Sequence, residues 1–274
     1  MTESLKIIAT PIGNIKDISE RTKIELQKAS IILAEDTRHT KSLIALLGIT
    51  TMPDIKWFSC NSYKEKLRIE VVSKALLENK SVVLVSDAGT PCISDPGSLL
   101  IKAVIEAGYT VQVIPGACAI TAAIMGSGLD YSKFAFLGFL PQKKSHREKL
   151  IKNSLMAELS LVIYEAPNRV NDTLLELYSY IGTTKVVVAR EITKLYETFH
   201  RGYLGQELMP KLVEKGECVI LIEKKTLENN NLEEIQSFID DNIALNKTKT
   251  EVVSLVQQKF NLSKSFSKQL VFKS

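Results

Sequence analysis

Short aliphatic runs alternate with longer amphipathic stretches through most of the chain. Residues 5–9, 31–34 and 82–85 are almost wholly apolar, which is typical of strands buried on both faces of a parallel sheet. Stretches of helical period separate these runs, and strands that alternate with helices indicate an α/β architecture. The predicted strands are residues 5–9, 31–34, 56–58, 82–85, 111–114, 134–139, 159–164, 186–189 and 218–222.

The predicted strands form two series with a stretch of small residues between them. A helix rich in alanine is predicted within residues 115–129, and the second series begins at residue 134. We therefore predict two α/β domains, residues 1–116 and 117–226. A linker of three asparagines at 229–231 then leads into a helical extension, residues 232–274, with a turn at 261–263. A single large sheet is the alternative.

Three of the predicted strands end in loops that are rich in glycine and proline or in charge. Residues 86–97 (SDAGTPCISDPG), 10–14 (TPIGN) and 35–39 (EDTRH) each follow an aliphatic run. Ligands of parallel α/β sheets bind at the carboxyl ends of the strands, so we expect these loops to form a cleft. Small residues such as Gly89 let the backbone approach a ligand closely. The alternative is that the loops are ordinary connecting turns.

Composition narrows the class of protein. The 274 residues are 45% apolar and 24% charged, which are ordinary globular values. No apolar run reaches the ~18 residues of a membrane span, and we expect a cytoplasmic protein without a membrane partner. The four cysteines and three histidines are scattered, which indicates neither a disulfide framework nor a metal site. Motifs of dinucleotide-binding proteins, P-loop NTPases, serine hydrolases and zinc proteases are missing.

Positive charge is concentrated near the carboxyl terminus. The formal net charge is only +4, but residues 247–274 hold six lysines against one acidic residue, Glu251. A second basic cluster follows the predicted strand 134–139. It consists of Lys143, Lys144, His146, Arg147, Lys149 and Lys152. Both clusters suit contacts with nucleic-acid phosphates, and the alternative is that they are solvated surface lysines.

Seven motifs in order along the chain resemble one family, the ribosomal-RNA small-subunit methyltransferase I family of the tetrapyrrole-methylase-like superfamily. The likeness runs from about Leu5 to Glu223. The motifs are Thr10–Asn14 (TPIGN), Ala34–Arg38 (AEDTR), Ser86–Pro91 (SDAGTP), Pro115–Ala119 (PGACA), Gly138–Pro141 (GFLP), Tyr164–Arg169 (YEAPNR) and Ala189–Lys194 (AREITK).

The resemblance implies two α/β domains of the tetrapyrrole-methylase type, with a cofactor cleft between them and a small helical C-terminal extension. It also implies S-adenosylmethionine as the cofactor. The residues it assigns to the cofactor are Ile12, Gly13, Asp87, Ala88, Gly89, Thr90, Ile93, Cys118, Ala119, Tyr164, Glu165 and Ile192. The Ala-Gly-Thr-Pro form of the loop at 88–91 is similar to the ribosomal branch of the superfamily rather than to the porphyrinoid branch.

The same resemblance implies methylation of the ribose 2′-oxygen of a cytidine in the decoding region of small-subunit (16S) ribosomal RNA. The partner would be this RNA or the 30S particle, and the protein would be a homodimer. A 2′-hydroxyl is a poor nucleophile, so a positioned base is expected, and we choose Asp36 or Glu191. An ion pair of Asp36 with Arg38 or Arg190 is the competing explanation.

Two other functions stay open from the sequence. A methylase of the same fold could act on a small molecule such as a porphyrinoid. A non-catalytic RNA-binding protein could have kept the fold. The basic extension and the intact loop motifs favour the RNA methyltransferase over both.

Overall fold

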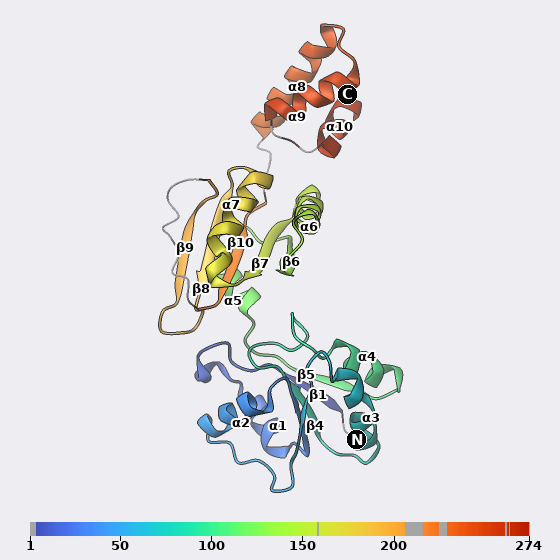
Figure 1. Ribbon diagram of the computed structural model, residues 1–274, viewed down its shortest axis with the longest axis vertical. Helices are drawn as coiled ribbons and strands as arrows, with labels where there is room; N and C mark the ends of the chain where they lie inside the picture. Colours follow the sequence, from blue (N-terminus) through green and yellow to red (C-terminus); the bar gives the residue numbers. More distant parts are fainter. Residues whose placement is uncertain are drawn as a thin grey trace. The chain divides into compact units, whose positions relative to one another are not determined.

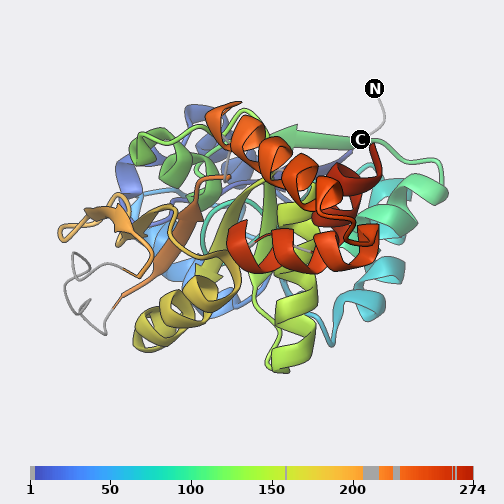
Figure 2. The same ribbon diagram turned by 90° about the horizontal axis from the view of Figure 1, so that it is seen from above.

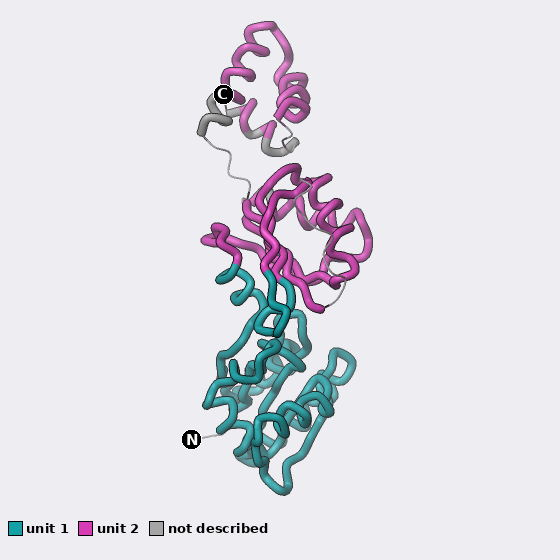
Figure 3. Tube along the Cα trace, turned by 90° about the vertical axis from the view of Figure 1, so that its left-hand side faces the viewer, with its two compact units in different colours: residues 1–126, 190–198 teal, residues 127–189, 199–274 magenta. Residues whose placement is uncertain are grey.

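The computed structural model describes residues 4–157, 159–205, 216–224, 229–260, 262 and 264–273. The chain divides into two compact units (Figure 3). Unit 1 comprises Met1–Gly126 and Arg190–Thr198, and unit 2 comprises Ser127–Ala189 and Phe199–Ser274. The units thus change after Gly126 rather than after residue 116, and a short later segment returns to unit 1. Each unit is described by itself.

Unit 1 is built on a five-stranded sheet in which every neighbouring pair of strands is parallel (Figure 1). The strand order is β3-β2-β4-β1-β5. The strands are β1 (Leu5–Ile8), β2 (Ile31–Ala34), β3 (Lys56–Ser59), β4 (Val82–Val85) and β5 (Val111–Ile114). All five carboxyl ends therefore lie at one edge of the sheet, and the loops predicted to form a site share that edge.

Helices cover both faces of this sheet. Leu26 and Ile44, from α1 (Glu20–Lys28) and α2 (Thr37–Leu46), lie in one buried cluster with Ile8 of β1. The opposite cluster contains residues of α3 (Glu65–Leu77) and α4 (Ser98–Glu106). The chain thus leaves β1 toward one face and β4 toward the other. Because β1 and β4 are neighbours, their carboxyl ends form a topological switch point, where α/β sheets bind ligands.

Local sequence sets where the first helix begins. A 3-10 turn, η1 (Ile15–Asp17), follows the loop after β1, and Asn14 caps this turn. The hydroxyl of Ser19 accepts a hydrogen bond from the Thr22 N–H at 3.1 Å and so caps α1. After β5, the small residues form α5 (Ala119–Ser127).

Unit 2 contains a second five-stranded sheet, in the order β6-β7-β10-β8-β9. Strand β6 is parallel to β7 with a register shift between Phe136 and Phe139, and β10 is antiparallel to β7. A buried cluster in this unit includes residues of α6 and α7. The elements are β6 (Phe134–Phe139), α6 (Lys144–Met156), β7 (Ser160–Glu165), η2 (Pro167–Arg169), α7 (Val170–Ile181), β8 (Lys185–Arg190), β9 (Thr198–Tyr203) and β10 (Cys218–Ile222).

The carboxyl-terminal helices have a core of their own. They are α8 (Asn229–Ala244), α9 (Lys249–Phe260) and α10 (Lys264–Lys273), which lie side by side in Figure 2. Ile235 and Ile239 of α8 are buried with Val252 and Val256 of α9. The asparagines expected as a linker belong to α8, whereas Asn261 and Ser263 of the expected turn lie outside the described residues.

Within the described part of the chain, no helix is long and apolar enough to cross a membrane.

Candidate functional site

The loops that follow β1, β4 and β5 are joined by hydrogen bonds. Thr10 and Gly89 exchange backbone bonds, with the Thr10 N–H donating at 2.8 Å and the Gly89 N–H at 3.1 Å. The Thr10 hydroxyl donates to the Ser86 carbonyl at 3.3 Å. The Thr90 hydroxyl donates to the Ala117 carbonyl at 3.0 Å. These bonds fix three loops at the switch point as one surface.

Two glycines in this surface sit where a side chain does not fit. Gly89 has φ +78°, and a Cβ atom there would lie 3.0 Å from Ile12 Cγ2. A Cβ atom on Gly116 would lie 2.9 Å from the Cβ of Ala9. Glycine is therefore required at both positions by backbone conformation or by close packing. The neighbouring Ala88 is exposed, whereas Gly89 is buried and its backbone groups bond to Thr10.

The segment 190–198 packs against the loop after β1. The Asn14 N–H donates to the Thr193 hydroxyl at 3.0 Å. A Cβ atom on Gly13 would lie 2.5 Å from Lys194 Cγ and 3.2 Å from the Ile192 carbonyl oxygen. Gly13 and Ile192, far apart in sequence, are thus in close contact. Glu191 and Thr193 adopt positive φ values of 52° and 67°, an uncommon backbone conformation for such residues.

Carboxyl groups gather at the ends of β2 and β4. The backbone N–H of Asp36 donates to Asp87 Oδ1 at 2.9 Å. Burial, and then the charge of Asp87, raise the pKa of Glu35. Burial, and then the charge of Glu35, raise the pKa of Asp95 to about 6, against a hydrogen bond from Ser86. Sequence reasoning gave Asp95 no role, although it lies in the same loop as Gly89. Its environment became visible only with the fold.

The two predicted bases have different surroundings. Asp36 caps α2 by accepting from the Arg38 N–H at 2.8 Å, and its other oxygen is 2.7 Å from Arg38 Nη2. Hydrogen bonds from Arg38 lower the pKa of Asp36 to about 2. The ion pair considered from the sequence is thus present, and Asp36 is a weak proton acceptor. Glu191 forms an ion pair with Lys194 at 3.0 Å, and its side chain is 16% exposed.

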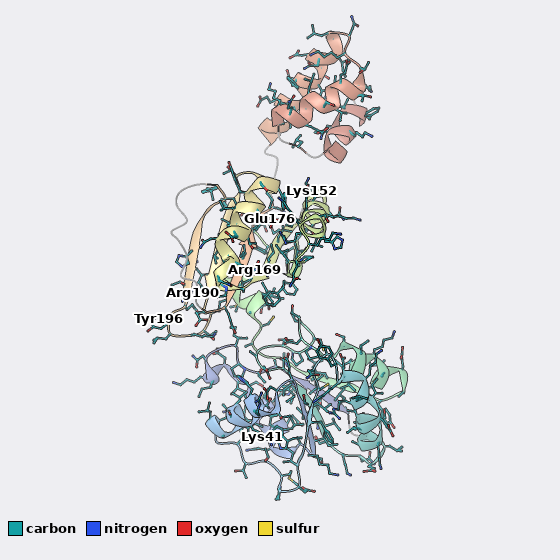
Figure 4. The ribbon with its side chains drawn as sticks, viewed as in Figure 1. Lys41, Lys152, Arg169, Glu176, Arg190 and Tyr196 are labelled. Carbon is teal, nitrogen blue, oxygen red and sulfur yellow. The ribbon has the colours of Figure 1, made fainter. Side chains whose placement is uncertain are left out.

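Two further predicted residues lie at the end of β7 in unit 2. The Tyr164 ring packs edge-on against Phe136, with centroids 4.8 Å apart. Glu165 is buried, and its carboxylate accepts from the Ala166 N–H at 2.9 Å and the Thr173 hydroxyl at 2.7 Å. Arg169, labelled in Figure 4, lies 3.4 Å from it. The Glu165 side chain therefore holds η2 and α7 in place, and any contact with a ligand would come from its backbone.

Part of the predicted basic cluster is neutralised within unit 2. Arg147 donates to Glu176 Oε2 at 2.9 Å and to the Gln142 carbonyl at 2.6 Å. Lys152 donates to Glu148 at 2.6 Å. These two residues form ion pairs within α6 and between α6 and α7, and the four other members of the cluster remain the candidates for phosphate contacts, namely Lys143, Lys144, His146 and Lys149.

The structure divides the predicted site residues between the units. Unit 1 holds Asp36, Glu191 and most of the predicted cofactor residues. The latter are Ile12, Gly13, Asp87, Ala88, Gly89, Thr90, Ile93, Cys118, Ala119 and Ile192. Tyr164 and Glu165 belong to unit 2. Within the described ranges, no three or more histidine, cysteine, aspartate or glutamate residues are grouped so as to hold a metal ion.

Comparison with known proteins agrees with this architecture. The profile described as Tetrapyrrole (Corrin/Porphyrin) Methylases matches residues 4–207. The crystal structure of the methyltransferase CobJ superposes with a TM-score of 0.59 at 17% identity, covering 81% of this chain and 94% of that one. A cobalt precorrin-4 methyltransferase, CbiF, gives 0.56 at 18% identity, covering 80% and 94%. At these identities the superpositions show a shared fold.

Sequence relatives are considerably closer. The Ribosomal RNA small subunit methyltransferase I of Haemophilus influenzae is 37% identical, over 84% of this chain and 82% of the relative. The protein of the same name from Synechocystis is 39% identical, over 87% of this chain and 84% of the relative. The chain therefore belongs to the ribosomal RNA small subunit methyltransferase I family, within the tetrapyrrole methylases.

Proposed function

We propose that this protein transfers a methyl group from S-adenosylmethionine to the ribose 2′-oxygen of a cytidine in the decoding region of small-subunit (16S) ribosomal RNA. One observation carries the proposal: the glycine loop at 88–90 is bonded to the loop after β1 at the switch point of the parallel sheet. The chain is also 37–39% identical in sequence to relatives named as ribosomal RNA methyltransferases.

The groups at this edge suit the proposed methyl donor. Its amino-acid end carries an ammonium and a carboxylate, next to a sulfonium, a ribose and an adenine. The exposed backbone at Ala88 can bind the carboxylate, and the carboxyl groups of Asp87 and its neighbours can bind a cation. Ile12, Ile93 and Ile192 supply apolar surface. The residues present therefore fit the donor.

Residue by residue, we assign the methionine end to Asp87, Ala88, Gly89, Thr90 and Ile93. Ile12, Gly13, Cys118 and Ala119 line the same pocket. Ile192, with Tyr164 and the backbone of Glu165, is assigned to the adenosine. When bound, the donor supplies an activated methyl group on a sulfonium, so the protein needs to align the acceptor and exclude water.

The acceptor proton needs a destination. We assign it to Glu191 rather than to Asp36, because Arg38 holds the pKa of Asp36 at about 2. Glu191 pairs with Lys194. We assign to the Lys194 ammonium the stabilisation of negative charge on the ribose oxygen. Glu191 has a positive φ and belongs to the segment that contacts Gly13.

The test is methyl transfer to defined substrates. Purified protein, labelled S-adenosylmethionine and 30S subunits from a strain that lacks this modification should give one labelled nucleoside. Alkaline hydrolysis should leave the adjoining phosphodiester intact, because a 2′-O-methyl group blocks it. Label on a base, label on a precorrin instead of RNA, or donor binding without transfer would contradict the proposal.

The compartment and assembly state also remain proposals. We propose that the protein acts on ribosomal subunits in the cytoplasm, and that it is a homodimer, as the resemblance to the family implies. Sedimentation at micromolar concentration checks the latter, with a mass of 30.5 kDa per chain as the monomer reference.

A further inference from the structure

The two most exposed tyrosines among the described residues lie at the same edge of the sheet in unit 1. Tyr63 is 92% exposed and Tyr196 is 67% exposed, whereas Tyr178 and Tyr203 of unit 2 are 42% and 40% exposed. Tyr63 follows the carboxyl end of β3. Tyr196 belongs to the segment that packs on the loop after β1 (Figure 4). Such rings present large aromatic surfaces on which a partner can stack.

The loop that carries Tyr63 is held at both ends. The Lys64 N–H donates to Asn61 Oδ1 at 3.1 Å. Buried Glu65 accepts from the Leu100 N–H at 3.0 Å and so ties the start of α3 to α4. Tyr63 is therefore exposed on an ordered turn, and little further ordering is needed when a partner binds.

The loop that carries Tyr196 is held in the same manner. The Thr193 N–H donates to Glu197 Oε2 at 2.6 Å, and the Glu197 N–H donates to the Lys194 carbonyl at 3.1 Å. Leu195 beside it is 88% exposed. This turn thus presents two apolar side chains to solvent next to the candidate donor loops.

The segments that carry these tyrosines lie on either side of the loops after β2 and β4. Strands β3 and β1 are three strand spacings apart, which is about 14 Å. The loops after β2, β4 and β1 lie between them. Exposed lysines accompany both rings, with Lys64 and Lys16 on segments of this edge. Aromatic faces spaced along a surface with cations are how proteins hold single-stranded nucleic acid.

We infer that single-stranded RNA crosses the carboxyl edge of this sheet, with Tyr63 and Tyr196 stacking on nucleotides that flank the one to be methylated. The inference rests on the proposed function, because it assumes RNA as the substrate. Stacking tolerates any base, so these residues grip and position the strand, and other groups select the cytidine.

The test uses the full-length chain with Tyr63→Ala and Tyr196→Ala, each beside its Phe and Leu variants. Each Ala variant should weaken binding to the unmethylated RNA by roughly five- to a hundredfold, with KM for 30S subunits raised and kcat at saturation little changed. Phe should restore binding, and Leu, of similar bulk without a π face, should not. Ultraviolet crosslinking should join RNA to the peptides that contain Tyr63 and Tyr196.

Leu77→Ala is the matched control, since Leu77 is 74% exposed on α3 but lies at the opposite end of that helix. Unchanged RNA affinity in both Ala variants, or equal rescue by Leu and Phe, overturns the inference. Loss of a dimer in Tyr196→Ala would also overturn the inference, because the turn that carries Tyr196 would then be a contact between copies of this chain. The RNA affinity of the variants tests the stacking. Methyl transfer by the unaltered chain tests the proposed function, so a failure of one can be distinguished from a failure of the other.

Discussion

Gly89 has a backbone conformation that an L-residue adopts only with strain, and it also lies beside Ile12. We predict that Gly89→Ala lowers affinity for S-adenosylmethionine by about 10²-fold, because a displaced loop misplaces the ligand. The positive φ of 78° should also cost about 1–2 kcal/mol of folding free energy. Titration calorimetry and urea unfolding give the two quantities.

Gly108→Ala provides the matched control. Gly108 has φ +82°, but a Cβ atom there would have nothing within 4 Å. This variant should show the same backbone penalty with unchanged donor affinity. If both variants bind the donor as the unaltered chain does, the loop at 88–90 is a structural turn.

The assignment of the base predicts different outcomes for two amide substitutions. Glu191→Gln should slow single-turnover methyl transfer by roughly 10²–10⁴-fold, the usual contribution of a positioned base. The residual rate should rise with pH as hydroxide replaces the missing acceptor. Asp36→Asn should lose far less, because Asn also caps helices and Asp36, with a pKa of about 2, is a weak base. The reverse order of effects would exchange the two roles.

Asp95 should make the protein less stable as pH rises. Its pKa is raised from 3.8 to about 6 in the folded state, so the folded protein binds the proton more tightly than the unfolded chain. Its contribution to the free energy of unfolding is therefore lost as pH rises from about 4 through about 6. Urea unfolding gives the free energy of unfolding of Asp95→Asn minus that of the unaltered chain. This difference should be larger at pH 7 than at about pH 4. An equal difference at both values would contradict the assigned environment.

At the level of elements, strands with uniform surroundings were the most predictable. Residues 31–34 and 82–85 are strands with the predicted bounds, because central parallel strands are aliphatic on both faces. Residues 111–114 also form a strand with the predicted bounds, although β5 lies at the edge of its sheet and is partly exposed. Strand β9 was missed. Its sequence, TFHRGY, mixes charged and small residues, and it lies at the edge of its sheet, where one side of the strand has no neighbour to select its residues.

Side-chain roles were less predictable than elements. Motif spacing placed Glu165 at a strand end, but only the fold shows that Thr173 and Ala166 take up its carboxylate. The contact of Gly13 with Lys194 joins residues far apart in the chain, and no local pattern reveals it. Long-range contacts depend on tertiary packing, so sequence periodicity carries no information about them.

That contact gives a prediction about the segment 190–198. Gly13→Ala places a methyl group 2.5 Å from Lys194 Cγ and 3.2 Å from the Ile192 carbonyl oxygen, so the segment must move. We expect a loss of about 1–3 kcal/mol in stability and faster amide exchange in residues 190–198. Gly202→Ala is the control, with nothing within 4 Å of its Cβ position. Unchanged exchange in Gly13→Ala would show that the segment is not held by this loop.

For the whole molecule, the proposed contact of α9 and α10 with RNA is best tested by charge rather than by truncation. Removing residues from 246 onward would leave Ile235 and Ile239 of α8 without Val252 and Val256. The double substitution Lys249→Gln and Lys268→Gln keeps this core. If both lysines contact phosphates, the slope of log affinity against log salt should fall by roughly 0.7–0.9 for each.

The corresponding control is Lys28→Gln with Lys80→Gln, exposed lysines that precede β2 and β4 at the opposite edge of the sheet. Equal salt slopes in both double variants and in the unaltered chain would mean that α9 and α10 contribute only to folding. Donor affinity should be the same in all three proteins.

The chain passes between the two units at three places, after Gly126, after Ala189 and after Thr198. A gene fragment that ends at the first junction would encode a unit without Thr193, the acceptor for the Asn14 N–H. Exchange of one unit between related genes would thus need three matched junctions instead of one. We therefore expect the two units to be inherited together when related genes recombine. Substitutions on the two sides of these junctions should then coevolve.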